Sequence, residues 1–218
     1  MRSLLLAVLL SAANAAAAPF AVQVGEARIG LDAPAGFADT TGTGSPRLQE
    51  LSEQLTSASN RVLLFAVSDG DLRRFTLGDP LELRRYMVVV TARATERERM
   101  SESGFKAFVA DSVREFGPLP PAPADVQKFL ESQPPGAVSL LAELRKDNEA
   151  LSVLQGTRSR GKLFERSKYL LSTSSVVLLR GKVLNLSVYT QYDDPADLEW
   201  IRITTARWID ELKRLNSR

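Results

Sequence analysis

The last third of the chain carries the pattern that most constrains the fold. From residue 182 to residue 192, polar and apolar side chains alternate, and this segment follows a tight turn at Arg180-Gly181. Such alternation places one set of side chains on each face of a strand, and a two-residue turn joins antiparallel neighbours. Three further segments of this region are typical of strands, namely residues 151–155, 164–171 and 176–179. Consecutive strands without intervening helices predict an antiparallel sheet rather than β-α-β units.

A long amphipathic helix is predicted after these strands. Asp194 is a favourable residue at the helix start, and Pro195 suits the first helical position. One stripe of side chains then recurs every three or four residues, formed by Leu198, Ile201, Thr205, Trp208, Leu212 and Leu215. A stripe of this kind packs on one face of a sheet.

The first two thirds of the chain mix predicted strands and helices without an internal repeat. We expect a hairpin over residues 22–32, a turn over 34–37, and short helices near 48–55 and 71–75. Two apolar runs predict buried strands at 61–68 and 84–93. Further helices are expected from Ser101 or Ser103 to Gly117, and over 125–132 and 137–146. The predicted fold class is therefore α+β, a mostly antiparallel sheet with helices packed on it.

The first residues have the three parts of a secretory signal. Arg2 gives a positive start, residues 4–10 are apolar, and residues 11–18 are small. The pattern predicts cleavage after Ala15, or alternatively after Ala17; a retained membrane anchor is the competing interpretation. The expected organisation is a signal peptide over 1–15 and a single globular domain over 19–218, with a Pro-rich connection at 118–123. No later stretch is long and apolar enough to span a bilayer, so the mature chain is expected in the periplasm without a transmembrane segment.

The composition excludes several kinds of chemistry. The chain has no His and no Cys, which removes imidazole bases, thiol nucleophiles and the commonest zinc ligands. With 28 basic and 26 acidic residues, the net charge of +2 is too small for a nucleic-acid partner. No cofactor is predicted, and the expectation is a protein that is not an enzyme.

Two short motifs suggest catalysis or nucleotide binding, and each has a structural explanation. Ser103 and Lys106 have the spacing of some serine hydrolases, but the partner motifs of those enzymes are missing and Ser103 is a natural helix cap. The segment from Gly156 to Lys162 matches most of a phosphate-binding loop. It has Leu163 where that loop needs Ser or Thr. A serine hydrolase using Ser103 and Lys106 remains an alternative function.

Basic residues gather between positions 158 and 182. A possible anion-binding surface consists of Arg158, Arg160, Lys162, Arg166 and Lys168. Such a surface could dock an acidic protein or an anionic component of the cell envelope. The competing interpretation is a charged sheet edge that protects against aggregation, and the sequence favours it.

The order of predicted elements resembles a known family of folds. A turn containing Pro34, Gly36 and Phe37, a long hairpin over 176–192 and a Trp-bearing C-terminal helix are arranged as in the α-β-α sandwich of the PsbP photosystem proteins and the Mog nuclear-transport factors. Uncharacterised exported bacterial proteins have a similar layout. The resemblance implies an accessory or binding protein. The predicted function is a non-catalytic, exported accessory or binding protein of the bacterial periplasm whose ligand the sequence does not identify. An envelope protein or an anionic envelope component is a candidate partner.

Overall fold

A seven-stranded antiparallel sheet organises the protein. The computed structural model describes residues 19–116, 123–159 and 168–217. The strands lie in the order β3 (Phe37–Asp39), β4 (Asn60–Ser68), β5 (Arg85–Ala92), β9 (Lys182–Gln191), β8 (Tyr169–Leu179), β7 (Ala150–Arg158) and β6 (Val138–Lys146). Every neighbouring pair is antiparallel. The predicted α+β class with a mostly antiparallel sheet is confirmed.

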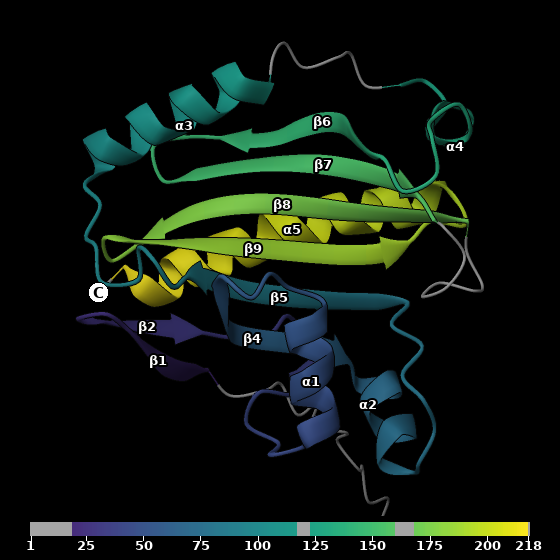
Figure 1. Ribbon diagram of the computed structural model, residues 1–218, viewed down its shortest axis with the longest axis horizontal. Helices are drawn as coiled ribbons and strands as arrows, with labels where there is room; N and C mark the ends of the chain where they lie inside the picture. Colours follow the sequence, from purple (N-terminus) through teal and green to yellow (C-terminus); the bar gives the residue numbers. More distant parts are fainter. Residues whose placement is uncertain (1–18, 117–122, 160–167, 218) are drawn as a thin grey trace, which may run out of the picture.

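Helices lie on both faces of this sheet (Figure 1). One face, here called the covered face, packs against α5 (Pro195–Asn216), α4 (Val126–Glu131) and the hairpin of β1 (Phe20–Val24) and β2 (Ala27–Leu31). The opposite face carries α1 (Pro46–Gln54), α2 (Asp69–Thr76) and α3 (Glu102–Phe116). The result is the α-β-α arrangement that the order of elements predicted.

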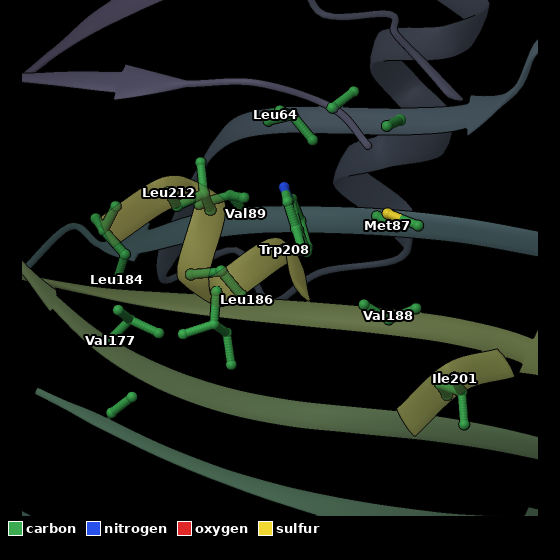
Figure 2. Close-up of a cluster of buried hydrophobic side chains, with 14 of the residues drawn as sticks. Leu64, Met87, Val89, Val177, Leu184, Leu186, Val188, Ile201, Trp208 and Leu212 are labelled. Carbon is green, nitrogen blue, oxygen red and sulfur yellow. The ribbon is translucent and has the colours of Figure 1, made fainter. Parts of the chain in front are cut away.

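The largest apolar cluster lies between the covered face and α5. Trp208 is 1% exposed, and it lies among aliphatic side chains from β4, β5 and β9, such as Leu64, Val89 and Leu186 (Figure 2). Its indole Nε1 donates a hydrogen bond to the carbonyl oxygen of Asp32, at 2.8 Å. The predicted stripe of α5 therefore supplies the centre of the core.

Both ends of α5 are fixed by specific side chains. Asp194 accepts a hydrogen bond from the backbone N–H of Ala196 at 2.7 Å, which confirms the predicted cap. At the other end, the Asn216 amide bonds both backbone groups of Gly30 in β2, at 2.9 and 2.8 Å. No helix in the described part of the chain has the length and apolarity needed to cross a membrane.

Two sequence predictions of secondary structure were wrong. The segment 137–146 was expected to be a helix and is strand β6. Its leucines mimic a helical period because two register shifts, at Leu140/Ala142 and Glu143/Arg145, interrupt the alternation of the strand. The second error was a break between strands at residues 172–175. These residues lie inside the continuous strand β8, where Ser and Thr side chains are accommodated on both faces.

Candidate functional site

The middle of the sheet is left uncovered on the side opposite α5. In Figure 1, α3 lies on one side of this region and α1 and α2 on the other. α3 packs over the end of these strands that holds Leu151, Val176 and Val183, and no described helix is drawn across the middle of β7, β8 and β9. Most of the half-buried side chains there are polar and uncharged, with Leu170, Val176 and Val183 as apolar neighbours on the same face. We call the polar set the open face: Gln155, Thr157, Ser172, Ser174, Asn185, Ser187 and Tyr189.

Strand register brings these residues into one patch. Ser174 in β8 lies directly opposite Ser187 in β9. Ser172 lies between Tyr189 on one side and Gln155 on the other. Directly opposed residues have Cβ atoms about 5 Å apart, so the polar groups are continuous across the three strands.

The polar side chains of the open face have no partners within the described part of the protein. Among the described residues, no hydrogen bond or ion pair involves the side chain of any of the seven. The hydroxyls on the covered face behave differently. Ser152 and Ser175 lie 2.7 Å apart, and Thr173 and Thr205 lie 3.0 Å apart. The donors and acceptors of the open face therefore remain available to water or to a ligand.

A stacked tyrosine pair forms the border of the open face toward α1. The ring of Tyr189 lies 4.4 Å from the ring of Tyr86, with an angle of 6° between their planes. Tyr86 is buried beneath it, and burial raises the pKa of the Tyr86 phenol, with a smaller contribution from Tyr189. Tyr189 thus presents a ring that is held in place by packing. On the other side, α3 contributes Phe108, whose side chain is exposed.

The predicted anion-binding surface is described only in part. Arg158 ends β7, and its Nη1 donates to the carbonyl oxygen of Glu131 in α4 at 3.2 Å. Lys168 is exposed just before β8. The other three predicted members, Arg160, Lys162 and Arg166, lie outside the described residues. Arg158 is therefore engaged beside α4, and the anion-binding surface as a whole stays a prediction.

The candidate serine and lysine lie on the exposed side of α3. Both Ser103 and Lys106 are exposed, and no hydrogen bond joins them in the described structure. The hydroxyl of Ser103 lies 3.0 Å from that of Ser101, which accepts a hydrogen bond from the backbone N–H of Gly104. Ser101 is thus the residue that caps this helix. Neither Ser103 nor Lys106 lines a described pocket.

The first glycine of the loop-like motif has a packing role. Gly156 lies within β7, and a Cβ atom at this position would lie 2.8 Å from the Cδ2 atom of Leu130. Glycine allows α4 to approach the strand closely. Lys162 and Leu163 lie outside the described residues. Within the described ranges, no group of three or more acidic side chains is placed to hold a metal ion.

Comparisons with known proteins find similarity in structure alone. No family model and no curated protein matches the sequence. Among solved structures, the Saccharomyces cerevisiae Ran-binding protein Mog1p has a TM-score of 0.39 and 11% identity, covering 92% of this chain and 93% of its own. A point mutant of protein Mog1 has a TM-score of 0.38 and 12% identity, covering 92% of this chain and 94% of its own. These proteins belong to the Mog-like group of folds that the order of elements resembles.

Proposed function

We propose that the protein is a non-catalytic binding protein of the bacterial periplasm and that its ligand binds to the open face. The observation that carries the proposal is the set of seven uncharged polar side chains that make no side-chain hydrogen bond within the described residues. Groups of this kind form hydrogen bonds with a ligand without the large desolvation penalty of a buried charge.

The chemistry of the patch favours recognition of polar, uncharged groups. Serine and threonine hydroxyls, two amides and a phenol can each donate and accept. The serine side chains on β8 and β9 are short, so a ligand can approach the strands closely between Tyr189 and Gln155. Ser172, Ser174 and Ser187 also lose little rotamer entropy when they become ordered by a contact, compared with Lys or Arg.

The absence of His and Cys supports the non-catalytic part of the proposal, because most acid–base and covalent mechanisms use one of these residues. The export signal at residues 1–18, which lie outside the described residues, supports the periplasmic part. Intact mass spectrometry of the protein from whole cells tests export directly. The expected mature chain begins at Ala16 or Ala18, and a chain retaining Met1 in the membrane fraction would contradict the proposal.

Cysteine footprinting tests the open face, because the natural chain has no thiol to interfere. Single variants Ser174→Cys and Ser187→Cys carry a label site on the open face, and Ser132→Cys, just after α4, is an exposed control. Each variant is labelled with a small maleimide in intact cells and as purified protein. A bound ligand is expected to slow labelling at the two open-face positions several-fold in cells, relative to Ser132→Cys.

Equal normalised labelling rates in cells and in buffer would rule out an occupied open face.

A fluorophosphonate probe addresses the alternative of a serine hydrolase. Covalent labelling that disappears in Ser103→Ala would overturn the non-catalytic proposal.

A further inference from the structure

A separate cavity lies between α1 and the sheet, away from the open face. Its volume is about 470 Å³, which is in the range of small-molecule sites. It lies beside one side of α1, next to the start of β4 and the residue that follows β5. We call it the α1 cavity; its polar lining includes Ser45, Gln49, Ser52, Thr56, Asn60 and Arg93.

Apart from the buried Leu48, the side of α1 that lines the cavity is polar, which is unusual for a helix packed on a sheet. Leu51 and Leu55 pack into the apolar cluster beneath α2. The cavity side instead carries Gln49, Ser52 and Thr56, three or four residues apart. A helix normally turns its apolar stripe toward the sheet and its polar stripe toward bulk water. Here part of the polar stripe lines a half-open cavity in which Ser52 is buried and Gln49 is exposed, which favours a polar occupant.

Three groups in the lining have unused hydrogen-bonding capacity. The Ser45 hydroxyl makes no capping hydrogen bond at the start of α1. Among the described residues, the Asn60 amide has no partner, and neither do the terminal nitrogens of Arg93. The Nε of Arg93 donates to the Asn60 carbonyl oxygen at 3.0 Å, which helps to fix the direction of the guanidinium group.

The other charged residues of the lining already have partners. Arg61 bonds both carboxylate oxygens of Glu96, at 3.1 and 2.6 Å, and the Gln23 carbonyl oxygen. Glu53 accepts a hydrogen bond from the Gln49 amide at 3.0 Å. Arg93 is therefore the lining cation whose terminal nitrogens make no hydrogen bond or salt bridge among the described residues; its side chain is exposed, and the Glu96 carboxylate interacts with its charge.

We infer that the α1 cavity binds a small hydroxylated carboxylic acid, such as a single-ring sugar acid. The carboxylate would pair with the terminal nitrogens of Arg93, whose fork geometry matches two carboxylate oxygens. The ligand's hydroxyl groups would bond Ser45 and Asn60. This site is independent of the open face, because the two share no residue.

Titration with D-glucuronate, followed by calorimetry or by NMR, tests the inference, with methyl glucoside as an uncharged control. Wild type is expected to bind glucuronate saturably and at least ten-fold more tightly than the glucoside. Arg93→Gln is expected to weaken glucuronate binding about ten-fold or more. Arg97→Gln removes an exposed charge that does not line the cavity and should leave binding unchanged.

A second variant, Ser45→Leu, fills the lining without changing charge and is expected to abolish binding while thermal unfolding stays cooperative. The open-face variant Ser174→Leu should bind glucuronate normally, which separates this site from the proposed function. The inference is overturned if wild type binds neither probe, if both bind equally, or if Arg93→Gln binds as well as Arg97→Gln.

Discussion

The two faces of strands β8 and β9 use the same residue types for opposite purposes. On the covered face, Thr173 and Ser175 are at most 1% exposed, and each has a hydroxyl partner. On the other face, Ser172 and Ser174 are half-buried and have no partner among the described residues. The comparison teaches that a run of serine and threonine in one strand can serve both stability and recognition, depending on the face.

The largest effect on the free energy of unfolding is expected when a core side chain beneath the covered face is shortened. Trp208→Ala should lower the free energy of unfolding by about 3–5 kcal/mol, because it leaves a cavity. It also removes the donor that bonds the Asp32 carbonyl oxygen. Urea unfolding measures the change. Ile203→Ala on the exposed side of α5 is the control and should shift stability far less; equal losses would show that α5 does not pack as described.

The next effect concerns the buried carboxylate of Asp197, which lies beneath Arg85 and Arg84 near the start of α5. Burial alone would raise the pKa of Asp197, but hydrogen bonds from Arg85 and from the Asp193 N–H outweigh it and hold the pKa below its usual value. Removing the charge with Asp197→Asn should cost about 2 kcal/mol at neutral pH.

The pH dependence follows from the lowered pKa of Asp197. A carboxyl whose folded pKa is depressed contributes stability above its unfolded pKa of about 4, and this contribution is lost as pH falls through the folded value. The stability gap between wild type and Asp197→Asn should therefore narrow between about pH 4 and pH 2. Urea midpoints at several pH values give the gap. A gap that stays constant down to pH 2 would contradict the role of Asp197.

A smaller effect is expected when one hydroxyl of a buried pair is removed. Thr173→Val keeps the shape but leaves the Thr205 hydroxyl without its partner, and it removes the acceptor of the Val188 N–H. The expected loss is about 1–2 kcal/mol. Chemical unfolding of Thr173→Val beside Thr173→Ser, which keeps the hydroxyl, isolates the hydrogen bonds. No difference between the two variants would argue against the pair.

The smallest effect on stability is expected on the open face. Ser174→Ala and Ser187→Ala should change the free energy of unfolding by less than about 0.5 kcal/mol, because neither hydroxyl bonds any other residue that the structure describes. The double variant should nevertheless weaken ligand binding. In the cysteine footprint, weaker binding means faster labelling in cells at a cysteine introduced by Ser172→Cys. A loss of stability as large as that of Thr173→Val would show that the two faces do not differ.

Local signals made much of the fold predictable. The turn between β8 and β9 has positive φ angles, 52° at Arg180 and 77° at Gly181, as a tight hairpin turn requires. Asp194 and Pro195 likewise mark the start of α5. The β6 segment was missed because two register shifts disguise its alternation.

The open face was only partly visible in the sequence. Asn185, Ser187 and Tyr189 share one side of an alternating strand, and that much could be predicted. Ser172 and Ser174 belong to the same patch because β8 is continuous through residues 172–175, where the sequence predicted a break. The patch also depends on the pairing of β7 with β8, which is set by tertiary contacts. The α1 cavity depends on how α1 packs against the sheet, and no local sequence pattern determines that packing.

The side-chain amide of Asn216 bonds both the N–H and the carbonyl oxygen of Gly30, as a neighbouring strand would, although 186 positions separate the two residues in the chain. The β1–β2 hairpin is therefore held by the last residue of α5. Because Asn216 follows every described strand in the chain, this contact can form only after all of those strands have been synthesised.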